Sequence, residues 1–217
     1  FSTIAHDIRA PVSSAYSLMQ LLDSEDTPPA ERRDMIQKLS TSFDNLSQFL
    51  DELLEWSRHQ LEDGKILPQF IDLDQVLDRI VGLYEPMIAS KTLKIHRTIK
   101  AGHIKIDEGG FSLILRNIIH NAIKFTPNDG VITIEVQELD NQVVTKISDT
   151  GVGIDQDYLD KIVAGSESLS SRGTNNETGS GFGLQACIQY IRYSGGQVDI
   201  KSEKGTGTEF LVTLPVG

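Results

Sequence analysis

Apolar side chains in residues 1–61 recur in alternating steps of three and four, the spacing of a narrow seam between helices. The seam residues are Ile4, Ile8, Pro11, Ala15, Leu18 and Leu22, then Ile36, Leu39, Phe43, Leu46, Leu50 and Leu53. A break at residues 23–26 predicts that the two helices form an antiparallel hairpin. Two helices with one seam cannot enclose a core, so we expect a second copy to complete a dimeric four-helix bundle. The alternative is that the seam packs on the chain's own second domain.

The pattern changes after residues 62–70, where Gly64 and Pro68 indicate a linker. Within residues 71–217 we expect helices at 72–90, 111–125 and 184–191, and strands at 93–99, 104–106, 131–136, 143–147, 197–200 and 208–214. Residues 166–180 are nearly all Ser, Gly, Thr, Asn and Glu, which predicts a mobile loop. The expected fold class is therefore α+β, with a helical hairpin followed by an α/β sandwich.

The chain is acidic, with 20 Lys and Arg against 31 Asp and Glu residues and a net charge of −11 over 217 residues. This balance argues against binding to nucleic acid or to an anionic membrane, so a phosphate ligand would have to be held by local geometry. The single cysteine, Cys187, excludes an internal disulfide and predicts a reducing, cytoplasmic location. No apolar run approaches the roughly 18 residues of a membrane span. Because the chain begins at Phe1, we expect a longer protein whose missing N-terminal part holds any sensor or membrane anchor.

The segment from His6 to Pro11 (HDIRAP) is the first that could carry chemistry. His6 lies on the helix face opposite the seam, so it faces solvent as a reacting nucleophile must. Asp7 could hold one ring nitrogen while the other attacks, and Pro11 predicts a kink nearby. An ordinary exposed histidine would occupy the same place, so this segment alone leaves both interpretations open.

Asn117, Asn121 and Lys124 are spaced at i, i+4 and i+7, and therefore share one face of the helix expected at 111–125. Two amides and an ammonium suit a metal-bound polyphosphate, because an amide oxygen can bind Mg²⁺ and the cation can bind phosphate. A solvated polar stripe is the alternative.

Two glycine-rich segments follow. Residues 149–154 (DTGVGI) come straight after a strand, where the Asp149 carboxylate can accept from an exocyclic amine and the glycines let a ring approach the backbone. Residues 179–184 (GSGFGL) open a helix whose N-terminal amides can bind phosphate. The spacing of these glycines excludes a P-loop and a Rossmann fingerprint.

In this order the motifs resemble those of two-component sensor histidine kinases, and the likeness covers essentially the whole chain. Residues 6–11 resemble the phosphoacceptor box, residues 117–125 the asparagine box of the Bergerat-type ATP-binding fold, and residues 149–154 and 179–184 its two glycine boxes. The resemblance implies a protein-histidine kinase that uses ATP and Mg²⁺. It also implies a homodimer through residues 1–61, an ATP-binding domain over 71–217 and a response regulator receiver domain as partner. The alternative is a nucleotide-binding signalling scaffold without phosphoryl transfer.

The resemblance further implies a role for each motif. His6 would take the γ-phosphoryl group with Asp7 as its base partner, and Asn121 would ligate Mg²⁺. The nucleotide would be bound by Asn117, Asn121, Lys124, Asp149, Gly151, Gly153, Gly179, Gly181, Gly183 and Leu184. Arg172, the only cation in residues 166–180, is a further candidate for a phosphate contact. Hydrolytic relatives carry a glutamate where this chain has Asn117, and an amide cannot act as a general base for water.

Ala10 departs from the family pattern. Members usually have Thr or Asn four residues after the histidine, where it positions water for dephosphorylation of the regulator, whereas the alanine side chain has no polar atom. We therefore expect the native chain to remove phosphate from its regulator more slowly than an Ala10→Thr variant. The measurement is the loss of phosphate from the phosphorylated regulator, and equal rates would contradict the prediction.

Overall fold

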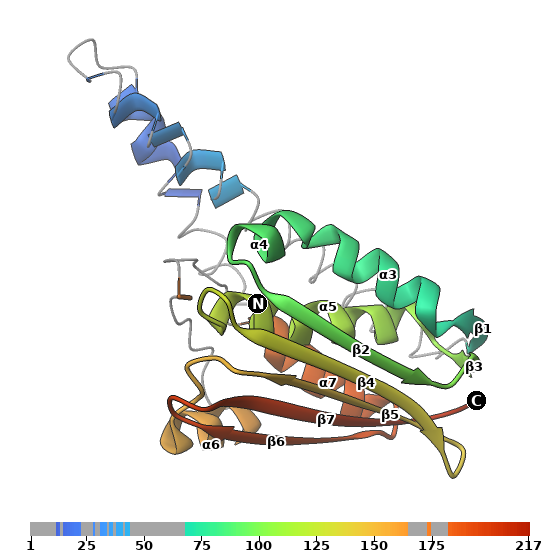
Figure 1. Ribbon diagram of the computed structural model, residues 1–217. Coiled ribbons are helices and arrows are strands. Elements are labelled where there is room, and N and C mark those ends of the chain that lie inside the picture. Colours follow the sequence, from blue (N-terminus) through green and yellow to red (C-terminus); the bar gives the residue numbers. More distant parts are fainter. Residues whose placement is uncertain are drawn as a thin grey trace. The chain divides into compact units, whose positions relative to one another are not determined.

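The computed structural model describes residues 12–13, 15–22, 28, 31–33, 35–36, 38–40, 42–43, 68–164, 173–174 and 182–217. The chain divides into two compact units, Phe1–Leu54 and Glu55–Gly217 (Figure 1). In the first unit the described residues of 12–22 and 31–43 are helical, as the seam predicts. Along the seam Ala15 is buried, whereas Ile36 and Phe43 are 53% and 51% exposed in the single chain.

The second unit is built on a five-stranded mixed sheet with the strand order β2-β4-β5-β7-β6. The strands are β2 (Lys94–Lys100), β4 (Val131–Leu139), β5 (Gln142–Asp149), β6 (Gln197–Glu203) and β7 (Gly207–Pro215). Strand β2 is parallel to β4, and the other neighbouring strands are antiparallel. Alternate residues of β4, such as Ile132, Ile134 and Val136, are buried, so one face of the sheet forms the core.

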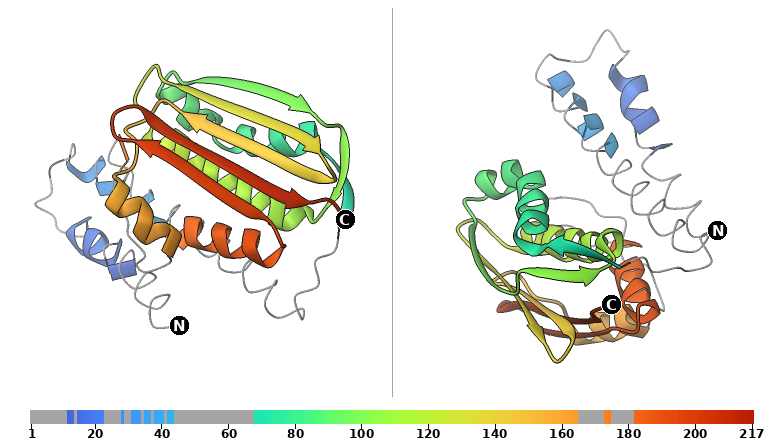
Figure 2. Two further views of the ribbon diagram at one scale, coloured as in Figure 1. Left: turned by 90° about the horizontal axis from the view of Figure 1, so that it is seen from below. Right: turned by 90° about the vertical axis from the view of Figure 1, so that its right-hand side faces the viewer.

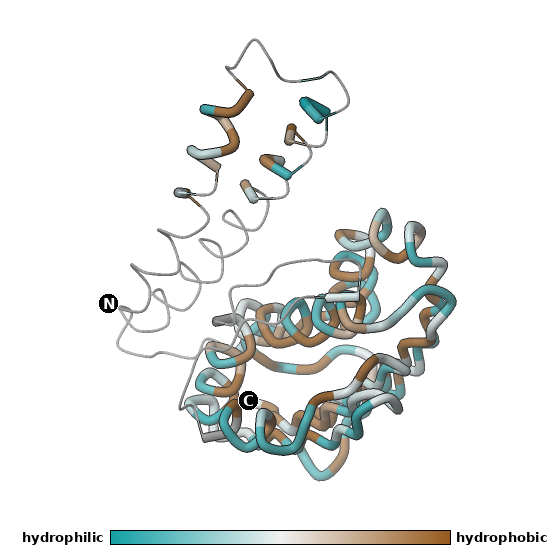
Figure 3. Tube along the Cα trace, turned by 90° about the vertical axis from the view of Figure 1, so that its left-hand side faces the viewer, coloured by the Kyte–Doolittle hydropathy of each residue, from teal (hydrophilic) through white to brown (hydrophobic). Residues whose placement is uncertain are grey.

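Helices cover that buried face (Figure 2). They are α3 (Leu73–Leu83), α4 (Glu85–Ser90), α5 (Glu108–Phe125), α6 (Gln156–Ala164) and α7 (Phe182–Tyr193). Helix α5 contacts α3, α7 and β5, and most of its side chains are buried. Apolar residues recur along these helices and strands between polar ones (Figure 3), as a two-layer sandwich requires. The predicted α/β sandwich is thus present in this unit.

A small second sheet joins β1 (Gln69–Asp72) to β3 (His103–Ile106) in antiparallel pairing. Strand β1 begins inside the stretch that the sequence indicates as a linker. A strand of four residues whose partner lies more than thirty positions away carries little periodicity of its own, which is why the pattern did not predict it.

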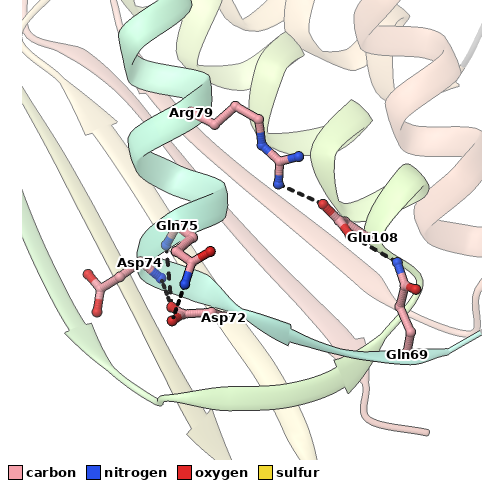
Figure 4. Close-up of polar contacts among 6 residues, drawn as sticks. All are labelled: Gln69, Asp72, Asp74, Gln75, Arg79 and Glu108. Carbon is pink, nitrogen blue, oxygen red and sulfur yellow. Dashed lines mark hydrogen bonds and ion pairs between the residues drawn. The ribbon is translucent and has the colours of Figure 1, made fainter.

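Polar contacts attach β1 to two helices (Figure 4). The Asp72 carboxylate accepts hydrogen bonds from backbone amides of the first turn of α3, and so caps that helix. Glu108, at the start of α5, accepts from Gln69 at 2.9 Å and from Arg79 at 2.6 Å. The start of α5 is therefore bonded to β1 and α3 together.

Two features of the helices differ from the sequence prediction. The single helix expected at 72–90 is two, α3 and α4, because the backbone turns at Tyr84 and Pro86 occupies the first turn of a new helix. Helix α6 was not predicted, since its nine residues carry only a short apolar face. Among the described residues, no helix has the length and apolarity needed to cross a membrane.

Gly110 in α5 lies against Tyr190 of α7, whose hydroxyl donates to Asp107 at 2.6 Å. A Cβ on Gly110 would lie 1.7 Å from the tyrosine ring, whereas a Cβ on Gly82 of α3 would meet nothing within 4 Å. We predict that Gly110→Ala lowers the free energy of unfolding by about 1–3 kcal/mol through overpacking. Gly82→Ala should raise it by about 0.5–1 kcal/mol, because alanine favours a helix. Urea unfolding of the two variants tests the opposite signs, and a stabilising Gly110→Ala would contradict the packing.

Candidate functional site

The C-terminal half of α5 carries three of the predicted site residues. Asn117 is buried, and its side-chain nitrogen donates to the Leu113 carbonyl at 2.9 Å. Asn121, one turn later, is half-buried. Lys124 is only 3% exposed, and its Nζ lies 4.8 Å from the centre of the Phe125 ring. The helix therefore presents amide and ammonium groups at a largely desolvated position, where they interact more strongly than in water.

Asp149 ends β5, and its carboxylate is held by two backbone amides. Its Oδ1 accepts from the Gly151 amide at 2.8 Å and from the Thr208 amide at 3.3 Å, while Oδ2 has no partner among the described residues. Burial raises the pKa of this carboxyl from 3.8 to about 6, because desolvation disfavours the charged form more than the two amide bonds favour it. One oxygen is thus fixed and the other can accept a donor.

The glycines after Asp149 are required by close backbone approaches. A Cβ on Gly151 would lie 2.5 Å from Asp149 Oδ1 and 2.6 Å from the Phe125 carbonyl oxygen. Gly153 has a φ of +67°, and a Cβ there would lie 2.1 Å from the Glu203 carbonyl oxygen. Any side chain at either position would push this loop away from α5 or from the turn between β6 and β7.

The β6–β7 turn supplies residues that the sequence prediction missed. Ser202 Oγ accepts from the Ile154 amide at 2.7 Å and lies 2.9 Å from Thr208 Oγ1, and the Gly205 amide donates to the Val152 carbonyl at 2.8 Å. These contacts hold the 151–154 loop against the β6–β7 turn. The hydroxyl residues on either side of the Gly205–Gly207 turn could have pointed to these contacts. Their pairing with residues about fifty positions earlier, however, is not visible in one sequence.

The loop and the first turn of α7 lie at the same end of the sandwich as the end of α5. The Val152 amide donates to the Phe125 carbonyl at 3.1 Å, which joins the loop to that end. Tyr190, near the end of α7, packs on Gly110, near the start of α5, so the two helices run antiparallel (Figure 1). The first turn of α7 therefore lies beside the later half of α5. Gly183 and Leu184 are in that turn, which contains no acidic residue to offset the positive end of the helix.

Five predicted residues, His6, Asp7, Arg172, Gly179 and Gly181, lie outside the described residues. The other eight gather at this one end of the second unit: Asn117, Asn121, Lys124, Asp149, Gly151, Gly153, Gly183 and Leu184. In the described part of the chain, no cluster of three or more His, Cys, Asp or Glu side chains could hold a metal ion. An ion such as Mg²⁺ needs no such cluster, because it takes one or two protein oxygens and completes its shell with phosphate and water.

Two family models match the chain. The model described as "Histidine kinase-, DNA gyrase B-, and HSP90-like ATPase" matches residues 106–217, and "His Kinase A (phospho-acceptor) domain" matches residues 1–62. The autoinducer 2 sensor kinase/phosphatase LuxQ of Vibrio parahaemolyticus is 32% identical over 98% of this chain and 26% of its own length. Sensor protein EvgS of Escherichia coli is 29% identical over 99% of this chain and 18% of its own length. The chain thus spans about a quarter or less of these curated relatives.

Solved structures share the fold. The histidine kinase AdeS of Acinetobacter baumannii matches 98% of both chains with a TM-score of 0.76 and 17% identity. Histidine kinase ThkA in complex with response regulator protein TrrA matches all of this chain and 60% of that chain, with a TM-score of 0.65 and 18% identity. The predicted α+β class, a helical segment followed by an ATPase-type sandwich, is confirmed by these likenesses.

The raised pKa of Asp149 predicts a pH-dependent stability. Between pH 3.8 and about 6 the folded chain holds a proton that the unfolded chain has lost, so the free energy of unfolding falls as the pH rises through this window. The full effect is up to about 3 kcal/mol and is constant above pH 6. An Asp149→Asn variant does not ionise there, so its stability relative to the native chain should grow from pH 4 to pH 7. Urea unfolding of both proteins across this range measures the difference, and a pH-independent difference would contradict the burial.

Proposed function

The chain belongs to the two-component sensor histidine kinases, with a phosphoacceptor domain followed by a histidine kinase-, DNA gyrase B- and HSP90-like ATPase domain, and from this premise we propose its activity. It is a histidine kinase core that phosphorylates its own His6 with ATP and then passes the phosphoryl group to an aspartate of a response regulator.

The Asp149 carboxylate is the observation that carries the proposal. Its Oδ1 is held by the Gly151 and Thr208 amides, and its Oδ2 has no partner among the described residues. An exocyclic amine of adenine can donate to Oδ2, and Gly151 and Gly153 leave the backbone bare where the ring must approach. A nucleotide base bound there lies at the end of the sandwich that also holds the late half of α5 and the first turn of α7.

The triphosphate is then bound by groups that need no basic surface. Asn117 and Lys124 of α5 would contact phosphates, and Asn121 would hold Mg²⁺ through its amide oxygen, an ion whose charge would offset that of the phosphates. The backbone amides of Gly183 and Leu184, with those of Gly179 and Gly181, add donors at the positive end of α7. Arg172 supplies a cation toward the same phosphates.

In the phosphoryl transfer, a His6 ring nitrogen attacks the γ-phosphorus while the bond from that phosphorus to the bridging oxygen breaks and ADP leaves. Asp7 accepts the hydrogen bond of the other ring nitrogen, which keeps the attacking nitrogen unprotonated. Asn117 favours this outcome over hydrolysis, because its amide cannot remove a proton from water.

Residues 1–61 are proposed to form the homodimer. The described part of that unit leaves six large apolar side chains about half exposed or more in a single chain: Val12, Tyr16, Met19, Leu21, Ile36 and Phe43. Ile36 and Phe43 belong to the seam, so a second copy that covers them supports the bundle. The solved complex of a histidine kinase with a response regulator supports a receiver domain as partner.

Labelling with ATP tests the activity. With Mg²⁺ and ATP carrying a labelled γ-phosphate, we predict that the native chain becomes labelled and that His6→Gln abolishes the labelling without changing ADP affinity. Asp149→Asn should lose both the labelling and the ADP affinity. Its amide oxygen would stay on the Gly151 and Thr208 amides, so its amide nitrogen would face the adenine amine, donor against donor. Persistent labelling of His6→Gln would contradict the assignment. Nucleotide binding without labelling of the native chain would favour the signalling scaffold.

A further inference from the structure

Lys91, the residue that follows α4, is 1% exposed, and its side chain enters the end of α5. Its Nζ donates to the carbonyl oxygens of Ile123 and Lys124, both at 2.9 Å, and lies 3.4 Å from that of Thr126. The Ile123 and Lys124 carbonyls are among the last four of the helix, which ends at Phe125, and cannot be bonded within it. A cation at this end also opposes the negative end of the helix dipole.

A fourth contact of Lys91 comes from the connection between α6 and α7. Lys91 Nζ lies 2.8 Å from Thr174 Oγ1, and the Thr174 amide donates to the Lys124 carbonyl at 3.1 Å. The same hydroxyl lies 3.1 Å from the carbonyl oxygens of Lys124 and of Thr126. Thr174 is therefore bonded to the backbone of the residue whose side chain is proposed to bind phosphate.

Hydrogen bonds from the loop after α5 fix the backbone at Lys91 and Thr92, and so orient the Lys91 side chain. Thr92 has a φ of +51°, which is uncommon for a β-branched residue and persists only where surrounding bonds enforce it. Here the Thr92 hydroxyl contacts Asp129 Oδ1 at 2.6 Å, and the Asp129 amide donates to the Lys91 carbonyl at 2.9 Å. The loop after α5 thus fixes the Lys91 backbone, and the end of α5 binds the Lys91 ammonium.

We propose that Lys91 and Thr174 form a positioning pair for nucleotide binding. Lys91 bonds carbonyls at the end of α5 and also contacts Thr174, so Thr174 is attached to the backbone of Lys124. The pair sets where the Lys124 ammonium lies relative to the phosphates without touching them. This inference rests on the proposed function, because it concerns the same nucleotide site.

Thr174→Val tests the pair, since valine keeps the branched shape and removes only the hydroxyl. We expect the Kd for Mg²⁺–ADP and the KM for ATP to rise about fivefold, the size expected from one lost hydrogen bond, with a smaller change in kcat. Thr174→Ser, which restores the hydroxyl, should restore both constants. Lys91→Met should raise the Kd at least as much, and adding Thr174→Val to it should cause no further loss.

Thr126→Val is the matched control. Its hydroxyl donates to the Ala122 carbonyl at 2.6 Å at the same helix end. Among the described residues that hydroxyl, unlike the Thr126 carbonyl, contacts neither Lys91 nor Thr174. Thr126→Val and Thr174→Val should lower thermal stability alike, but only Thr174→Val should weaken nucleotide binding. Native affinity in Thr174→Val, or an equal loss in Thr126→Val, would overturn the positioning pair alone. A native chain that binds no nucleotide would overturn the proposed function and this inference with it.

Discussion

The last carbonyl groups of α5 cannot be bonded within the helix, and residues from three other parts of the chain bond them. Lys91 Nζ reaches the Ile123 and Lys124 carbonyls, the Thr174 amide reaches that of Lys124, and the Val152 amide reaches that of Phe125. Because an unbonded buried carbonyl is costly, these bonds hold the segment after α4, Thr174 and the loop after β5 at one place. The candidate site lies where they meet.

The sequence predicted the elements whose signals are local. Helix α5 and strands β4 and β5 follow from apolar spacing, and Asn117, Asn121 and Lys124 follow from positions on one helix. What it did not predict depends on partners far along the chain. Strand β1 forms only by pairing with β3, and Thr208 belongs to the site because its amide donates to Asp149. Lys91 is buried because its ammonium bonds the end of α5, about thirty residues later in the chain. Such pairings leave no periodicity in one sequence.

The net charge of −11 says little about the ligand, because the charges that matter are those at the site. Salt screens exposed charges over about 10 Å, so acidic residues scattered over the surface are weakly felt at a desolvated position. At the site, Lys124 is buried beside the Phe125 ring, and the first turn of α7 carries no acidic residue. An acidic chain can therefore bind a polyphosphate without a basic surface.

The Oδ2 of Asp149, unbonded within the part of the chain that the structure describes, gives a reason for selectivity between bases in the proposed site. The folded chain keeps a carboxylate partly out of water, with one oxygen bonded to the Gly151 and Thr208 amides and the other left to accept. A base that presents an amine satisfies that oxygen and recovers the cost of its burial. A base that presents a carbonyl at the same place puts its oxygen against the carboxylate oxygen. Both oxygens are acceptors, so both stay desolvated and without a hydrogen bond. If Asp149 binds the base as proposed, the site therefore favours adenine over guanine.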